Sequence, residues 1–540
     1  MNNGILKYCF EKGCLIDKEV YEVLDKLGNT EVAKKIIESL TVQLNQKIIT
    51  KTILGKYSRE LQQITQSNEE KTTIERICIN LGINIEITKK EQILIDQKNA
   101  EKVMEATKVE ILEIKEEGIE IIKKGRVKVL NSHINKERKV TVPDFVKHFK
   151  IRYQMIKKML QERPELENLT TINKLSMKRQ NVSIIGMVLN KRITKNKNII
   201  IEVEDPTGKI NVLINSNKEE ACKIAKQILL DDIIGIKATG DHTILFANEI
   251  YYPDAIVRDK VRLEEDESVA FISDIHVGSK LFLRENFEKF IKWLNGEVGE
   301  EEQKKEALKI KYLMIIGDNI DGVGVYPGQE KLLEMPDIRD QYKELARYLN
   351  MIRKDLTIMM IPGQHDSVRV AEPQPPIGKD YGEPLHEIDN LLLLSNPCTV
   401  EIGGNTEGGK GIKILMYHGA SFAGIINEIE DLRLGRAFDT PTKVVKHLLK
   451  RRHLSPTHSF TPYIPNETRD PMVIEHTPDI VATGDLHKSD IDTYNNILLI
   501  TGGCWQSTTP FEEKVGNHPD PCKVPIYNLK TRALKIIDFS

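Results

Sequence analysis

The period of the hydrophobic and polar positions changes along the chain. Within residues 1–70, apolar side chains such as Val20, Leu24 and Leu27 recur at helical spacing, which predicts a small helical N-terminal module. Residues 71–165 begin with a segment rich in Lys, Glu and Ile and almost without aromatic side chains, so we expect a charged linker there, followed by a basic helix.

Short runs of alternating apolar and polar residues fill most of residues 166–260. They predict five strands with a helix after the third strand, which is the layout of an OB-fold β-barrel. Such barrels bind single-stranded nucleic acid in some proteins and dock other proteins elsewhere, and both roles stay open here.

Residues 261–540 contain buried-strand patterns that end in polar side chains. In the first, Asp274 and His276 lie two residues apart, on the same side of an extended chain. Strand ends of this kind meet at one edge of a sheet, where carboxylate, imidazole and amide ligands favour Mn²⁺, Mg²⁺, Fe or Zn over copper. The residues that follow the successive strands are Asp274 and His276, Asp318, Gln364 and His365, His418, and Asp485 and His487.

Composition adds few constraints. The chain has 540 residues and a formal net charge of −2, so its global charge points to no polyanionic partner. We find no apolar run of the roughly 18 residues that span a bilayer and no signal peptide, and therefore expect a cytoplasmic protein without membrane contact. The 7 cysteines form no Cys-x-x-Cys pair, so neither a disulfide framework nor a zinc ribbon is expected.

Positive charge is concentrated locally. Residues 121–160 contain twelve Lys or Arg against two acidic residues, which fits either contact with phosphate groups or an acidic partner, or a solvated face. A second basic segment also contains His447, His453 and His458, which we interpret as incidental to a basic helix. Its cations are candidates for guiding DNA or binding a partner: Lys443, Lys446, Lys450, Arg451 and Arg452.

The order Asp-x-His, Gly-Asp-x-x-Asp, Gly-Gln-His-Asp, His, Gly-Asp-x-His resembles calcineurin-like metallophosphoesterases over residues 267–540. Longer stretches resemble the small subunits of archaeal family D DNA polymerases. These stretches are IPGQHDSVRVAEPQPP, DNIDGVGVYPGQE, KHLLKRRHLSPTHS, GGCWQSTTPF and PDFVKHFKIRYQMIKKMLQERPEL, and the resemblance extends over residues 140–540.

The resemblance implies a multidomain α+β protein whose phosphoesterase domain is a β-sandwich flanked by helices. It implies a nucleoid-associated 3′-to-5′ exodeoxyribonuclease that proofreads for a larger catalytic subunit, acts on primer-template or single-stranded DNA, and reaches a sliding clamp through the complex. Two divalent ions, Mn²⁺ or Mg²⁺, are implied, with Asp318 bridging them. The implied ligands are Asp274, His276, Asp318, Gln364, His418, Asp485 and His487.

The same resemblance assigns roles around the ligands. His365 is the implied catalytic imidazole, which stabilises developing charge or protonates the leaving 3′ oxygen. Asp366 is implied to orient His365, and Asp321 to support a ligand without binding an ion itself.

Two residues depart from the family pattern. Gln364 stands where the motif usually has Asn, and Asp485 where it usually has His. Both keep a ligating oxygen, but the change motivates an alternative, a catalytically inactive scaffold subunit. A further alternative is a free-standing phosphoesterase that acts on small phosphate esters or RNA.

Overall fold

The computed structural model describes residues 4–17, 20–21, 34, 37–38, 41, 48–49, 110–112, 121–124, 126–133, 139–257, 259–404 and 410–540. The chain divides into two compact units, residues 1–108 and 109–540. In the first unit, α1 (Gly4–Glu11) precedes β1 (Leu15–Ile16), which pairs in parallel with β2 (Ile48–Ile49). Leu24 and Leu27, which carry part of the predicted helical pattern, lie outside the described residues.

A closed five-stranded barrel occupies the middle of the second unit, with the strand order β10-β8-β7-β6-β9. Alternate side chains of β7 point into a core of Ile, Val, Leu and Ala residues. The predicted five strands and the helix after the third are confirmed. The elements are β6 (Gln180–Ile193), β7 (Ile199–Asp205), β8 (Gly208–Ile214), α8 (Glu219–Lys226), β9 (Ile233–Gly240) and β10 (Ile244–Tyr251).

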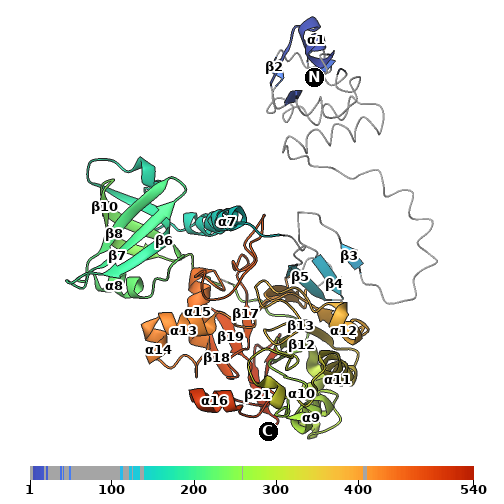
Figure 1. Cartoon of the computed structure of the whole chain (residues 1–540). Helices are drawn as coiled ribbons and strands as arrows, with labels where there is room; N and C mark the ends of the chain where they lie inside the picture. Colours follow the sequence, from blue (N-terminus) through green and yellow to red (C-terminus); the bar gives the residue numbers. More distant parts are fainter. Residues whose placement is uncertain are drawn as a thin grey trace. The chain divides into compact units, whose positions relative to one another are not determined.

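Two sheets form the rest of this unit (Figure 1). The six-stranded sheet has the order β14-β13-β12-β11-β20-β21, and the eight-stranded sheet has the order β18-β19-β17-β16-β15-β5-β4-β3. The six strands are β11 (Ser268–Ile272), β12 (Ile310–Ile316), β13 (Thr357–Ile361), β14 (Leu391–Leu393), β20 (Lys523–Asn528) and β21 (Leu534–Asp538). The eight are β3 (Glu110–Leu112), β4 (Ile121–Lys124), β5 (Val127–Asn131), β15 (Cys398–Ile402), β16 (Ile412–Met416), β17 (Ile480–Thr483), β18 (Asp490–Tyr494) and β19 (Ile497–Thr501).

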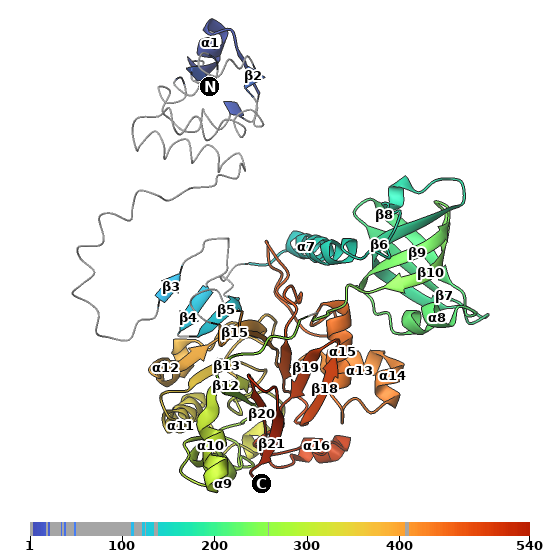
Figure 2. The ribbon, with the colours of Figure 1, turned by 180° about the vertical axis from the view of Figure 1, so that it is seen from behind.

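The alternation of side chains along the strands builds three hydrophobic layers. Phe271 of β11 and Met416 of β16 belong to the layer shared by the two sheets. Ile272, the neighbour of Phe271, packs instead toward the helices that cover the six-stranded sheet. Figure 2 shows the sheets between helices on two sides. The helices are α9 (Arg284–Leu294), α10 (Glu301–Lys309), α11 (Ile338–Asn350) and α12 (Lys379–His386), and on the other side α13 (Phe422–Glu428), α14 (Glu430–Leu434) and α15 (Thr442–Arg451).

The prediction of a linker is wrong for Val127–Asn131, which form strand β5. β5 pairs antiparallel with β15, and Val127 and Val129 are buried in the layer between the two sheets. The Lys- and Glu-rich composition concealed this strand because only every second side chain of β5 faces the core.

The predicted basic helix is α7 (Val142–Gln161), which begins at a capping box formed by Thr141 and Asp144. One face of the helix is buried, and it includes His148 and Arg152. None of the helices in the described part of the chain combines the length and the apolar character needed to cross a membrane.

Candidate metal centre

The predicted site residues come together at one edge of the two sheets. β11, β12 and β13 run parallel, as do β16 and β17, so the loops after these strands converge. The loops carry Asp274, His276, Asp318, Gln364, His365, His418, Asp485 and His487.

These loops hold left-handed backbone conformations at residues that are not glycine. The φ angles of five of the predicted ligands lie between +47° and +70°, and the five are Asp274, His276, Asp318, Asp485 and His487. Such a conformation costs a non-glycine residue of order 1–3 kcal/mol and is typical of functional sites. The prediction that Asp274 and His276 share one side of an extended chain is therefore wrong, because the strand ends at Ile272.

Nitrogen and oxygen atoms from these residues lie within ligand distance of one another. The Nε2 atoms of His276 and His487 are 3.2 Å apart, and Nε2 of His418 is 3.3 Å from Oδ2 of Asp318. Three groups could each hold an ion: Asp274–His276–His487, Asp274–Asp318–His418 and His276–Asp321–His365. Asp274 is common to the first two.

Unsatisfied polar atoms show that these residues fit divalent cations. The buried atoms Nε2 of His418 and Oε1 of Gln364 have no hydrogen-bond partner in the described part of the chain. Leaving a buried polar atom unpaired costs about 1–3 kcal/mol, so ligands that pair with these atoms are favoured. Nδ1 of His418 lies 2.8 Å from the carbonyl oxygen of Ile316, and donation from Nδ1 directs the Nε2 lone pair into the cluster.

The electrostatics of the cluster reflect an excess of carboxylates. Burial disfavours a charged imidazole at His418, but the carboxylates of Asp318, Asp274 and Asp485 together outweigh burial and raise the pKa of His418 well above its ordinary value. Within the described residues, no Lys or Arg forms an ion pair with Asp274, Asp318 or Asp485. The negative charge is therefore left for a bound cation to balance.

Glycine allows the close approach of these loops. A Cβ atom at Gly363 would overlap the Asp318 carboxylate and approach Nε2 of His418. The loop that carries Gln364 and His365 can therefore reach the cluster only with glycine at this position.

His365 lies at the edge of the cluster with one ring nitrogen held and the other directed toward it. Nδ1 is 2.7 Å from the carbonyl oxygen of Asp321, and Nε2 is 3.8 Å from Oδ2 of Asp318. The backbone N–H of His365 donates to Oδ1 of Asp318 at 2.9 Å. A cavity of about 970 Å³ is lined by His365 and by the predicted ligands other than Asp274 and His418.

Comparison with known proteins shows which family this chain resembles. Residues 269–491 match the family model for the B subunits of DNA polymerases alpha and epsilon, and residues 182–243 match an OB-fold nucleic acid binding domain. A protein of Methanothermobacter thermautotrophicus named DNA polymerase II small subunit is 38% identical over 400 residues, which are 74% of this chain and 80% of that protein.

The chain belongs to the family of DNA polymerase II small subunits. Members from Pyrococcus furiosus and Methanocaldococcus jannaschii are 37% and 36% identical over 76% and 72% of this chain. The alignments cover 66% and 64% of those two proteins, so parts of them have no counterpart in the matched region.

In this small subunit, Asp366 does not contact the His365 imidazole, which corrects the role expected for it. Its carboxylate accepts hydrogen bonds from the backbone N–H of Gly363 at 2.9 Å and from the side chain of Asn319 at 2.8 Å, and Tyr342 also donates to it. Burial and the Asp318 charge raise the pKa of Asp366 to about 6. Asp366 therefore holds the loop in place, and the Asp321 carbonyl orients His365.

The predicted DNA-contacting cations divide into two groups. Arg451 and Arg452 are buried, with 3% and 8% exposure, and the prediction is wrong for these two. Nε of Arg451 donates to Oδ1 of Asp232 at 2.9 Å, which ties α15 to the barrel, and Arg452 donates to backbone carbonyls of Ile474 and Glu475. The exposed or partly exposed cations are Lys443, Lys446 and Lys450.

The two departures from the family motif contact each other. Nε2 of Gln364 donates to Oδ1 of Asp485 at 3.0 Å, and the backbone N–H of Asp485 donates to the Asp274 carboxylate. This leaves Oε1 of Gln364 directed away from Asp485 and without a partner in the described part of the chain.

Sequence reasoning missed Glu512, whose Oε1 lies 2.9 Å from Nδ1 of His487. Its other oxygen accepts from the backbone N–H of Thr509 at 2.8 Å, in a capping box at the start of α16 (Pro510–Val515). The spacing Thr509-x-x-Glu512 indicates the cap. It does not indicate the histidine, which lies 25 residues earlier.

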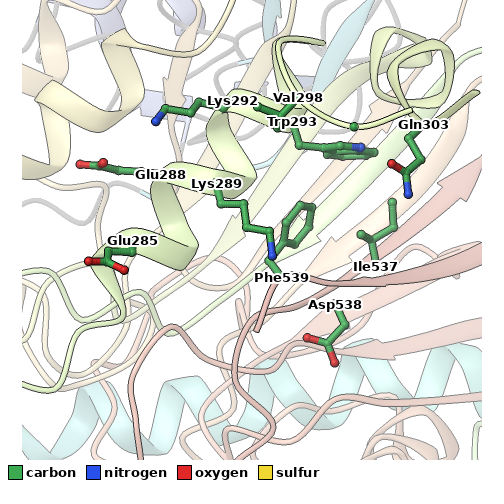
Figure 3. A pocket seen from close by; sticks show the side chains of 11 residues that line it. Glu285, Glu288, Lys289, Lys292, Trp293, Val298, Gln303, Ile537, Asp538 and Phe539 are labelled. Atoms are coloured by element: carbon green, nitrogen blue, oxygen red, sulfur yellow. The ribbon is translucent and has the colours of Figure 1, made fainter. Parts of the chain in front are cut away.

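A second cavity of about 640 Å³ lies away from the predicted ligands (Figure 3). Glu285, Lys289 and Trp293 of α9 line it together with Phe539 near the end of the chain. The residues that line it include no histidine or cysteine, so we place the metal chemistry in the larger cavity.

Proposed function

We propose that this chain is a metal-dependent 3′-to-5′ exodeoxyribonuclease that removes mismatched nucleotides for a DNA polymerase. The observation that carries the proposal is the pair of unpartnered ligand atoms, the fully buried Nε2 of His418 and Oε1 of Gln364, in a cluster whose Gln364 and His365 line the larger cavity. The two-sheet domain around this cavity is then a calcineurin-like phosphoesterase domain with an attached OB-fold.

Two divalent cations fit the ligand groups. One would be held by Asp274, His276 and His487, and the other by Asp274, Asp318 and His418, with Gln364 and Asp485 adjacent to both groups. Asp274 is the residue common to both groups, whereas Asp318, the bridge expected from its motif position, belongs to the second group alone. Bound Mn²⁺ or Mg²⁺ would activate water and neutralise charge on the phosphodiester.

The chain itself supplies a proton at a defined atom. The Asp321 carbonyl can only accept a hydrogen bond, so it keeps a proton on Nδ1 of His365. In the imidazolium form the second proton is on Nε2, and giving it to a substrate in the cavity leaves the neutral ring with its Nδ1 proton. Protonation of the leaving 3′ oxygen by Nε2 is the role that this geometry supports.

The names of the relatives describe small subunits, and we extend that assembly to this chain. A large catalytic subunit is the proposed partner, and an unpaired 3′ end of primer-template or single-stranded DNA is the proposed substrate. The sliding clamp would be reached only through the complex. An unpaired end is favoured because a nucleotide without base pairs costs less to separate from the duplex.

The test is cleavage of a 5′-labelled primer with a 3′ mismatch by the full chain, with Mn²⁺ and with Mg²⁺, alone and with the large subunit. We expect a ladder of shortened products, and a loss of about 10²- to 10⁴-fold in rate for His365→Ala. His242→Ala is the matched control, because His242 is exposed in the turn between β9 and β10 of the barrel. Equal rates for both variants would exclude the proposed role of His365.

One observation favours a second candidate, the inactive scaffold. The hydrogen bond between Gln364 and Asp485 joins the two residues that depart from the family motif. A scaffold would shorten no primer under any cation, although it would still bind the large subunit. Turnover of a small chromogenic diester without DNA cleavage would instead support a phosphoesterase of small substrates.

A further inference from the structure

The larger cavity has walls whose chemistry differs from that of its floor. Tyr326 and Pro327 contribute to one part of the wall, and Phe438 and Leu486 to another. The Tyr326 ring centroid is 6.3 Å from that of His365, and Phe438 is 40% exposed. An exposed phenylalanine beside a charged metal centre is a feature that the ligand set does not explain.

Two arginines line the same cavity from α14 and the turn after it. Arg433 donates to the backbone carbonyl of Asn427 and forms no ion pair with any carboxylate among the described residues. Arg436 pairs with Asp439 at 2.8 Å, and its side chain is 82% exposed. Within the described ranges, neither arginine pairs with the carboxylates of the metal cluster. The Arg433 charge is therefore available to an anion in the cavity, and Arg436 can exchange its weak, exposed ion pair with Asp439 for such an anion.

The arrangement has the parts that a nucleotide requires. Cations held by the ligand residues would engage one phosphate, the arginines match a second phosphate, and the aromatic side chains match the face of a base. The volume of about 970 Å³ lies at the upper end of the range for pockets that enclose small ligands. The cavity therefore suits a flexible single-stranded end rather than a rigid duplex.

We propose that this cavity contains a nucleotide subsite in which Phe438 stacks on the unpaired 3′-terminal base, Tyr326 lines the wall nearest His365, and Arg433 and Arg436 bind the adjacent phosphate. Stacking uses the face that every base shares, so the subsite accepts all four bases. The inference rests on the proposed exonuclease function, and it names the groups that hold its substrate.

The experiment compares two single strands that differ only at the 3′ end, one with a normal terminal nucleotide and one with an abasic terminal residue. The full chain, alone and with the large subunit, is assayed with Mn²⁺ for KM and kcat. We expect the abasic end to raise KM of the wild type about tenfold, which is the scale of one base–aromatic stack. Phe438→Ala should raise KM for the normal end by a similar factor with kcat within about twofold, and should abolish the difference between the two strands.

Leu434→Ala is the matched control for the aromatic wall, because Leu434 is 74% exposed in α14 and is absent from the cavity lining. Arg433→Ala together with Arg436→Ala should weaken binding of both strands equally and reduce its salt dependence. The control for them is Arg262→Ala, an exposed arginine elsewhere on the chain.

Discrimination between normal and abasic ends that persists in Phe438→Ala would overturn the subsite, and so would a wild type that does not discriminate. Binding of the same two fluorescent strands, followed by anisotropy with Mn²⁺, separates this proposal from the proposed function. If the wild type hydrolyses neither strand, the exonuclease is excluded. In that case the subsite is tested by binding alone. It is supported if the wild type binds the normal strand more tightly than the abasic strand and Phe438→Ala binds both equally.

Discussion

Two buried clusters of aspartate and histidine differ in how their polar atoms are satisfied. In the metal cluster, Nε2 of His418 has no hydrogen-bond partner in the described part of the chain, and the carboxylates lack arginine or lysine partners there. In the second cluster, Oδ2 of Asp470 lies 2.5 Å from Nε of Arg152, 3.0 Å from Nε2 of His453 and 3.3 Å from Nε2 of His148.

The difference separates a ligand site from a structural contact. Burial would raise the pKa of Asp470, but Arg152 and the histidines outweigh burial and hold that pKa well below its ordinary value. Its charge is therefore already balanced, and the cluster joins α7 to the loop after α15. Residue types alone do not distinguish the clusters, because both combine buried Asp and His.

The largest difference between the two clusters is expected in the rate of primer shortening. Asp318→Asn should lower the rate of primer shortening at least about 10³-fold, because the variant loses a charged ligand and its share of the charge that holds the cations. Asn keeps an oxygen to accept from the His365 N–H, so the fold should persist. Asp470→Asn should retain the wild-type rate per folded molecule. Similar losses in both variants would contradict the comparison.

The free energy of unfolding should depend strongly on the Asp470 cluster, in contrast to the rate of primer shortening. Asp470→Asn should lower the free energy of unfolding by about 3–5 kcal/mol in urea titrations, since Arg152 is left buried without a carboxylate. Asp340→Asn is the control, because its ion pair with Lys343 is exposed and is worth less than about 1 kcal/mol. A loss below about 1 kcal/mol for Asp470→Asn would show that the buried ion pair is dispensable.

Addition of Mn²⁺ should also distinguish the two clusters, through its effect on the free energy of unfolding. At a free Mn²⁺ concentration of 100 times its Kd, we expect the unfolding free energy of the wild type to rise by about 2.7 kcal/mol over its value in EDTA. The increase should persist in Asp470→Asn and shrink in Asp318→Asn, and thermal unfolding with and without Mn²⁺ measures it. Equal increases in the two variants would place the ion elsewhere.

The smallest expected effect is a pH dependence of the Asp470 cluster. Burial and the nearby Arg152 lower the pKa of His453 to about 4. The unfolded chain binds a proton at His453 near pH 6.5, whereas the folded chain does so only near pH 4, so stability falls as the pH falls through this window. From pH 7 to pH 5 the loss is about 2 kcal/mol.

His453→Gln should remove that loss while its amide can still donate to Asp470. Urea titrations of wild type and variant at pH 7 and pH 5, both in EDTA, measure the difference. The same decrease in both proteins would show that His453 takes no part in the acid sensitivity.

Local patterns predict much of the architecture and of the ligand set. The barrel strands follow from alternation over residues 178–251, and the candidate ligands, which the structure brings together, follow from polar residues at the ends of buried strands. The wrong predictions for β5 and Arg451 have a common cause, which is that the partner of each lies far away in the sequence. β5 resembles a linker in sequence because its partner β15 lies about 270 residues away, and Arg451 resembles a DNA contact because its partner is Asp232 in the barrel.

The candidate metal-binding side chains can be named from local sequence signals, because Asp, His and Gln at strand ends need no partner to be recognised. Which of their atoms remain unsatisfied depends on the folded structure. Glu512 holds His487, the Asp321 carbonyl holds His365, and Arg152 neutralises Asp470 across 318 residues of chain. Whether a buried Asp is a ligand or a structural contact depends on the charges that folding brings beside it, and these come from distant parts of the chain.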